Sequence, residues 1–252
     1  RMAEVAVIGA GAVGLFYGAL LQRAGHTVTF QSASGARALA RRPLEVTSPW
    51  GDFRLKVRVL ADPAGLEPAG LVLVSVKALP GIDYKRLLAP VLRPGSVILL
   101  LQNGIGIDGR LAALFPGTTV LSGLAFTCIN RTAPQRVVHS GYGQINVGAR
   151  RREEYRQGRE TAALLAAAGI KCTFGGDARC LRWKKLLWNV PFNCLSVVLG
   201  GVTTDRMMAS PPVLELVRQL MGEVRACAAA EGVRITHGDI AVMLDKIGRA
   251  HV

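Results

Sequence analysis

The sequence has few cysteines, and their arrangement excludes two common frameworks. Its 252 residues hold five cysteines, an odd number scattered along the chain with no Cys-x-x-Cys pair. A small disulfide-rich fold uses an even set, and a structural zinc site uses closely spaced pairs. We therefore expect free thiols, no metal site and a cytoplasmic location, where thiols stay reduced.

Long uncharged runs are also scarce. Residues 5–21 carry no charge, but Glu4 precedes them and glycines interrupt them. The run could imitate a signal-peptide core or a weak membrane span, although a signal peptide would begin with positive residues and glycine weakens an apolar helix. No other stretch is long enough to cross a bilayer, so we expect no membrane partner.

Acidic residues are in short supply. The chain has 17 Asp and Glu against 31 Lys and Arg, a formal net charge of +14. A basic surface can attract nucleic acid, an anionic membrane or a small anion. Here the positive residues are spread along the chain and do not interleave with aromatic residues, which make up only 6%. We therefore expect no nucleic-acid partner, and attribute the charge to solvated surface and an anionic substrate.

What is present begins with a glycine motif between a predicted strand and a predicted helix. Residues 5–8 form a short apolar strand, and apolar residues recur at helical spacing after the motif. The motif residues are Gly9, Ala10, Gly11, Ala12, Val13 and Gly14. Its first glycine permits a tight turn, its second lets backbone approach a pyrophosphate, and its third lets the helix pack on the strand. This context predicts a dinucleotide site at the helix N-terminus.

The end of the second predicted strand, residues 27–30, indicates which dinucleotide binds. An acidic side chain there would bind the ribose 2′-hydroxyl of NAD. Instead, residues 31–37 contain Ser32, Ser34 and Arg37 but no carboxylate. Small hydroxyls and a nearby arginine accommodate a 2′-phosphate, so NADP(H) is favoured over NAD. A plain surface loop is the alternative.

Strands and helices alternate to about residue 176, and helices alone follow. We expect further strands at 44–47, 53–59, 71–76, 97–101, 120–127 and 171–174, a hairpin from 137–139 and 144–147, and helices at 36–42, 82–92, 153–168, 178–190, 212–231 and 239–247. This pattern predicts an α/β fold, with an N-terminal Rossmann-like doubly wound sheet followed by an all-helical C-terminal domain. We assign residues 1–176 to the NADP-binding domain and residues 177–252 to a helical substrate and catalytic domain.

Two polar residues follow neighbouring predicted strands. Lys77 comes directly after the strand at 71–76, and Asn103 lies just beyond the strand at 97–101. In open parallel sheets, ligands bind beyond the carboxyl ends of the strands. We expect both side chains to meet cofactor or substrate, with ordinary strand-end polarity as the alternative.

A second polar set opens the helical half. Lys185, Asn189 and Asn193 are spaced four residues apart, which places them on one face of an α-helix. An ammonium that can give up a proton beside two amides suits an anionic, hydroxylated substrate. The alternative is a solvated polar stripe. Pro191 removes a helical N–H, so we expect a kink that moves Asn193 relative to Lys185.

Together these motifs resemble the ketopantoate reductase (2-dehydropantoate 2-reductase) family. The matching segments are G-A-G-A-V-G at 9–14, S-V-K-A at 75–78, Q-N-G-I-G at 102–106 and W-K-K-L-x-x-N-x-x-x-N at 183–193. The resemblance covers essentially the whole chain. It implies NADPH-dependent reduction of 2-dehydropantoate to (R)-pantoate, in pantothenate and coenzyme A biosynthesis, by a monomer or homodimer. The alternatives are a same-fold reductase of another small 2-oxo acid and a non-catalytic NADP(H)-binding sensor.

The resemblance also implies roles for individual residues. Lys185 would be the general acid that protonates the C2 oxygen of the substrate. The other implied contacts are Lys77 with the cofactor, Asn103 with cofactor and substrate, the backbone at Ile129 with the nicotinamide, and Asn189 and Asn193 with the substrate.

The chain departs from the family pattern at three places. Ala33 stands where members commonly have an arginine after the second strand, and Thr203 stands where another substrate-binding asparagine is usual. We keep Thr203 as a substrate contact. The family's late Ser-Met-x-x-Asp segment and a C-terminal glutamate would begin near Val252, so we expect the helical domain to be incomplete at its C-terminus.

Overall fold

The structure, a computed structural model, describes residues 2–249. It divides into two compact units, Arg1–Ala178 and Arg179–Val252. The first combines a sheet with helices, and the second is helical throughout its described part. Within the part of the chain that the structure describes, no helix has both the length and the apolar character that a membrane span needs.

All strands of the described residues 2–249 belong to the first unit. They are β1 (Glu4–Ile8), β2 (Thr27–Gln31), β3 (Leu44–Thr47), β4 (Phe53–Leu55), β5 (Arg58–Leu60), β6 (Leu71–Val74), β7 (Val97–Leu100), β8 (Thr119–Ala133), β9 (Arg136–Ala149) and β10 (Cys172–Asp177). Its α-helices are α1 (Ala12–Arg23), α2 (Ala36–Arg41), α3 (Tyr84–Leu88), α4 (Ile107–Leu114) and α5 (Tyr155–Ala167). Short 3₁₀ turns are η1 (Pro63–Gly65), η2 (Ala89–Val91) and η3 (Arg152–Glu154).

In its described part, the helical unit contains five α-helices and one wider turn. These are α6 (Ala178–Trp188), the π-helical turn η4 (Asn189–Asn193), α7 (Cys194–Val198), α8 (Thr204–Ala209), α9 (Pro211–Ala230) and α10 (His237–Arg249). Its core joins α6 to α9: Trp183 and Leu187 are buried with Val217, Met221 and Val224. The last three recur at helical spacing, so α9 turns one apolar stripe inward.

The ten strands form one mixed sheet in the order β4-β3-β9-β8-β7-β6-β1-β2-β5, with β10 paired to β9. From β8 to β5 every neighbouring pair is parallel. The order β7-β6-β1-β2 within it is that of a Rossmann-like sheet. The prediction of a Rossmann-like N-terminal sheet followed by helices is confirmed, and the antiparallel pair β8 and β9 extends it.

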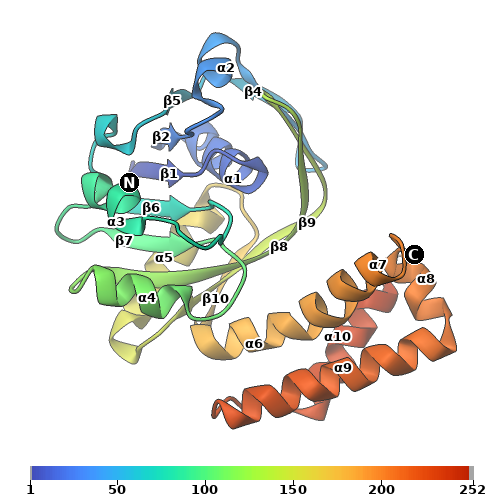
Figure 1. Ribbon diagram of the computed structural model, residues 1–252. Helices are drawn as coiled ribbons and strands as arrows, with labels where there is room; N and C mark the ends of the chain where they lie inside the picture. Colours follow the sequence, from blue (N-terminus) through green and yellow to red (C-terminus); the bar gives the residue numbers. More distant parts are fainter. Residues whose placement is uncertain (1, 250–252) are drawn as a thin grey trace. The chain divides into compact units, whose positions relative to one another are not determined.

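The sheet is strongly curved. β4 and β5 lie at opposite ends of the strand order, yet only two residues, Lys56 and Val57, separate them in the chain. Three Cα–Cα steps span at most about 11 Å, so the two edges must approach each other. The result is a half-barrel with α1 inside its curve (Figure 1). The expected single strand at 53–59 is therefore wrong, because its two halves join different edges.

A second correction concerns the segment after β8. The expected hairpin within residues 137–147 is wrong, because β9 is one continuous strand paired antiparallel to β8. The pairing register shifts between Phe126 and Thr127, which pair with Gln144 and Tyr142, so that Gly143 is skipped. Tyr142 and Gly143 have positive φ values of 59° and 102°. The glycine signal that suggested a hairpin turn instead marks irregular, bulged pairing within a long strand.

Both faces of the sheet are covered. In β1, the side chain of Val7 packs into the same core as Phe16 of α1, whereas that of Ile8 packs into a second core with Leu88 of α3 and Leu111 of α4. Alternate side chains of a strand point to opposite faces, so β1 is buried on both sides. This explains its continuous apolar sequence.

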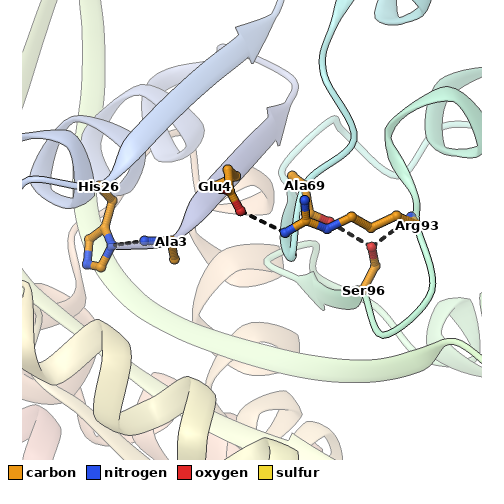
Figure 2. A network of polar contacts seen from close by, with 6 residues as sticks. All are labelled: Ala3, Glu4, His26, Ala69, Arg93 and Ser96. Atoms are coloured by element: carbon orange, nitrogen blue, oxygen red, sulfur yellow. Dashed lines mark hydrogen bonds and ion pairs between the residues drawn. The ribbon is translucent and has the colours of Figure 1, made fainter. Parts of the chain in front are cut away.

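Polar contacts fix the amino ends of the central strands (Figure 2). Arg93 forms an ion pair with Glu4 at 2.7 Å, and the Ser96 hydroxyl donates to the carbonyl oxygen of Ala69 at 2.6 Å. The backbone N–H before Glu4 donates to Nδ1 of His26 at 3.1 Å. These groups precede or begin β1, β2, β6 and β7. The glycine motif lies at the other end of these strands, directly after the carboxyl end of β1.

Candidate functional site

The glycine motif forms a tight turn between β1 and α1. The backbone N–H groups of Gly9 and Ala10 both donate to the carbonyl oxygen of Gln31, at 3.2 and 2.9 Å. Gly9 has φ +98°, and a Cβ there would lie 2.6 Å from the backbone nitrogen of Val76. A Cβ on Gly14 would lie 2.3 Å from the carbonyl oxygen of Gly9. The first and third glycines are therefore required by the packing of the protein itself.

The middle glycine is different. Gly11 is exposed, and a Cβ built on it would meet nothing within 4 Å. It immediately precedes α1, whose first-turn N–H groups and dipole favour an anion. Open space at a glycine before a helix is what a bound pyrophosphate requires. The packing of the protein does not require a glycine at position 11, whereas a bound dinucleotide would. The residues of this turn therefore fit a dinucleotide.

The loops after β6 and β7 lie at the same edge as this turn, because β1, β6 and β7 are parallel neighbours. After β6, the Ser75 hydroxyl donates to the carbonyl oxygen of Gly9 at 2.6 Å, and Lys77 is exposed. After β7, buried Gln102 donates to the carbonyl oxygen of Val76 at 2.8 Å, and Asn103 is exposed. The expected strand-end residues thus share one edge with the glycine turn; their contact with a ligand stays a prediction.

The part of β8 beyond its pairing with β7 carries two further residues of interest, Ile129 and Arg131. β8 pairs with β7 only as far as Ser122 and then continues to Ala133. Ile129, which the sequence suggested for the nicotinamide, is half-buried in this extension. Further along, Nη1 of Arg131 donates to the carbonyl oxygen of Ala10 at 3.0 Å. Nothing in the local sequence marks Arg131, because its contact with Ala10 depends on the length and curvature of β8.

In the helical unit, two consecutive lysines have opposite environments. Lys184 of α6 forms an ion pair with Asp239 at 2.7 Å, and the hydrogen bond to this carboxylate raises the pKa of Lys184. Burial, together with the nearby charge of Arg182, lowers the pKa of Lys185 to about 8. Desolvation disfavours a charged amine. Lys185 is therefore the lysine that can exchange a proton near neutral pH.

The two asparagines follow Lys185 on a distorted stretch of helix. Regular α-helix ends at Trp188, and the π-helical turn η4 follows, containing Pro191. The side-chain amide of Asn193 donates to that of Asn189 at 3.5 Å. The expected distortion at Pro191 is thus a wider turn that keeps the asparagine side chains adjacent. Such π-turns interrupt α-helices, frequently at functional sites.

Thr203 lies at the N-terminus of α8. It directly precedes this helix and is exposed. Its role as a substrate contact stays a prediction. In the part of the chain that the structure describes, no group of three or more His, Cys, Asp or Glu side chains is arranged to hold a metal ion.

The chain is similar to known reductases over most of its length. Residues 5–152 match the family model described as ketopantoate reductase PanE/ApbA, and residues 177–251 match the model of its C-terminal part. A 2-dehydropantoate 2-reductase from Nostoc sp. is 36% identical, covering 96% of this chain and 77% of the relative. The crystal structure of 2-dehydropantoate 2-reductase from Geobacter metallireducens GS-15 has a TM-score of 0.88 and 38% identity, covering 97% of this chain and 82% of that one.

A more distant likeness shows the fold alone. The ternary structure of D-mandelate dehydrogenase with NADH and anilino(oxo)acetate has a TM-score of 0.86 at 18% identity, covering 96% of this chain and 79% of that one. The two ranges that the family models match include the motifs at 9–14, 75–78, 102–106 and 183–193. The chain therefore belongs to the ketopantoate reductase family of nicotinamide-dependent oxidoreductases.

Proposed function

We propose that this chain catalyses the NADPH-dependent reduction of 2-dehydropantoate to (R)-pantoate, a step towards pantothenate and coenzyme A. The observation that carries the proposal is the half-buried amine of Lys185, whose pKa is lowered to about 8, followed by two adjacent amide side chains. Support also comes from relatives that bear this activity in their names and are 36% and 38% identical over nearly the whole chain.

The chemistry divides between cofactor and protein. When bound, the reduced nicotinamide supplies the hydride that attacks the carbonyl carbon C2. Negative charge then develops on the carbonyl oxygen, and Lys185 donates its Nζ proton to that oxygen, so that the carbonyl becomes a secondary alcohol. A proton donor whose pKa lies close to the working pH is efficient in this role. The neutral lysine afterwards recovers a proton from solvent.

The other residues bind and orient the reactants. The turn at Gly9–Gly14 would hold the pyrophosphate on backbone N–H groups at the start of α1. The remaining proposed contacts are Lys77 and the backbone at Ile129 with the cofactor, Asn103 with cofactor and substrate, and Asn189, Asn193 and Thr203 with the substrate. We assign residues 1–176 to cofactor binding and residues 177–252 to substrate binding and catalysis.

The nearest alternative is reduction of a different small 2-oxo acid. The same fold occurs in a D-mandelate dehydrogenase at 18% identity, so the fold does not determine the substrate. Thr203 belongs to the proposed substrate contacts and carries a hydroxyl, unlike the amide side chains of Asn189 and Asn193. We favour 2-dehydropantoate because the motif residues and the more similar relatives agree. We also propose a cytoplasmic monomer or homodimer.

Steady-state turnover tests this assignment. NADPH oxidation is followed by absorbance with 2-dehydropantoate, 2-oxoisovalerate and phenylglyoxylate, each also with NADH. We expect the highest kcat/KM for 2-dehydropantoate with NADPH. A higher value for another 2-oxo acid would identify a different reductase. Cofactor binding without turnover of any of these acids would favour a sensor of NADP(H).

A further inference from the structure

The end of β2 and the turn after it contain no arginine before Arg37, and residue 33 is an alanine. The structure brings another arginine to the same place from a distant part of the chain. Arg131, on the extension of β8, donates through Nη1 to the carbonyl oxygen of Ala10 in the glycine turn, at 3.0 Å. A contact between residues so far apart in sequence follows from the curvature of the sheet.

The guanidinium of Arg131 also lies against the turn that follows β2. In this turn the backbone N–H of Gly35 donates to the Ser32 hydroxyl oxygen at 3.0 Å. A Cβ built on Gly35 would stand 2.8 Å from that oxygen and 3.0 Å from Nη2 of Arg131. Arg131 therefore touches the two elements that flank the adenosine ribose in dinucleotide-binding folds, the glycine turn and the end of the second strand.

The charge of Arg131 has no acidic counterpart. Among the residues that the structure describes, no carboxylate pairs with it, and its protein hydrogen bonds all go to backbone carbonyls, those of Ala10 and Pro134. These three bonds use three of the five N–H donors of a guanidinium, so two remain for a ligand. Partial burial lowers the pKa of Arg131, yet a guanidinium stays protonated at neutral pH.

We propose that Arg131, together with the Ser32 hydroxyl, binds the 2′-phosphate of NADPH and sets the preference for NADPH over NADH. The inference rests on the dinucleotide site of the proposed function. A guanidinium suits a phosphate because its paired N–H groups match two phosphate oxygens. The Ser32 hydroxyl accepts from Gly35, which leaves its hydrogen to donate. Arg37, named from the sequence, is exposed on α2, and it forms no hydrogen bond or ion pair with the turn among the described residues.

Direct binding measurements test the proposal without requiring catalysis. Dissociation constants for NADPH and NADH are measured by nicotinamide fluorescence in the unaltered protein and in Arg131→Ala, Arg131→Lys and Arg37→Ala. We expect Arg131→Ala to weaken NADPH binding by about 10- to 100-fold, the loss typical of a charge-assisted hydrogen bond. NADH binding should change by less than about twofold, since NADH lacks the phosphate that the arginine would contact. Arg131→Lys should recover part of the loss, and Arg37→Ala should behave like the unaltered protein.

Several results would overturn the proposal. In one, Arg131→Ala weakens both cofactors equally, which would mean that the arginine only supports the glycine turn through Ala10. In another, Arg37→Ala abolishes the preference, or the unaltered protein binds NADH as tightly as NADPH. The outcome is separable from that of the proposed function. If Arg131 sets the preference for NADPH over NADH but the protein reduces no 2-oxo acid, the phosphate site is supported and the proposed reductase activity is not.

Discussion

At the scale of single residues, Gly11 and Gly14 occupy one motif for different physical reasons. A Cβ on Gly14 would collide with the carbonyl oxygen of Gly9 at 2.3 Å and with the Ser75 hydroxyl at the same distance. A Cβ on Gly11 would stand in open space before α1. Gly14 therefore serves the packing of α1 against the sheet, whereas the open space at Gly11 leaves room for the proposed pyrophosphate.

This difference gives a matched pair of variants. Gly14→Ala should destabilise the fold by about 3 kcal/mol, as overpacking against backbone does. Gly11→Ala should change the free energy of unfolding by less than about 1 kcal/mol, because φ of −80° suits alanine. It should nevertheless weaken NADPH binding by about tenfold or more, since the methyl group would occupy the space for the pyrophosphate. Urea unfolding measures the free energy of unfolding of each variant, and NADPH titration measures its affinity for the cofactor. Equal stability of the two variants would contradict this division of roles.

Sequence reasoning at this scale works where a residue's neighbours are close in sequence. The row of Lys185, Asn189 and Asn193 was predictable because helical spacing brings such residues together. The lowered pKa of Lys185 was not, since it depends on burial in the folded protein and on the nearby charge of Arg182. Arg131 was unpredictable for the same reason: its partner Ala10 lies far away in the chain, and their contact requires the folded half-barrel.

At the scale of elements, Lys184 ties α6 to the start of α10. Asp239 accepts from Nζ of Lys184 at 2.7 Å and from the backbone N–H of Thr236 at 2.9 Å, and its own N–H donates to the Thr236 hydroxyl oxygen at 3.1 Å. The reciprocal bonds form a capping box at the first turn of α10. These interactions lower the pKa of Asp239 to about 2.

The linkage between this pKa and stability predicts a pH-dependent effect. The carboxylate of Asp239 has a lower pKa in the folded protein than in the unfolded chain. Its contribution is therefore present above about pH 4 and is lost as pH falls towards 2. Asp239→Asn should cost about 1 kcal/mol at pH 7, because Lys184 is partly exposed and solvent screens the pair.

Urea unfolding followed by tryptophan fluorescence measures this cost. The difference between Asp239→Asn and the unaltered protein should shrink as the pH is lowered from 4 towards 2. Glu223→Gln removes an exposed carboxylate from the same unit and serves as the control, with little expected change. A cost that is the same at pH 7 and at pH 3 would show that the ion pair contributes nothing.

The elements themselves were predictable to different degrees. Strands buried on both faces, such as β1, β6 and β7, were evident from short apolar runs, and α9 was evident from its apolar stripe. α4 and α8 were not predicted, because they are short and lack a strong apolar period. Pro90 shortens the helix expected at 82–92: α3 ends at Leu88 and a 3₁₀ turn, η2, follows.

At the scale of the whole molecule, each unit has a hydrophobic core of its own. The first unit has two, one on each face of the sheet, and the helical unit has a third. The overall plan of a Rossmann-like sheet followed by helices was predictable from the alternation of strands and helices. The half-barrel was not, because the pairing of β3 and β4 beside β9 is set by contacts distant in sequence.

In the proposed reaction, the first unit binds the dinucleotide and the second carries the proton donor. The central proposal is that Lys185 protonates the substrate carbonyl oxygen. Lys184→Ala provides the matched control for Lys185→Ala, because it removes a neighbouring amine whose pKa is raised and which pairs with Asp239. Both variants should still bind NADPH, since neither lysine belongs to the proposed cofactor contacts.

The most direct test is the pH dependence of the hydride-transfer rate in single turnovers with saturating NADPH and 2-dehydropantoate. In the unaltered protein and in Lys184→Ala, the rate should fall about tenfold per pH unit above about pH 8, as the Lys185 amine loses its proton. Lys185→Ala should be about 10²- to 10⁴-fold slower at pH 7 and lack this inflection. A Lys185→Ala variant that keeps both the rate and the inflection would contradict the account.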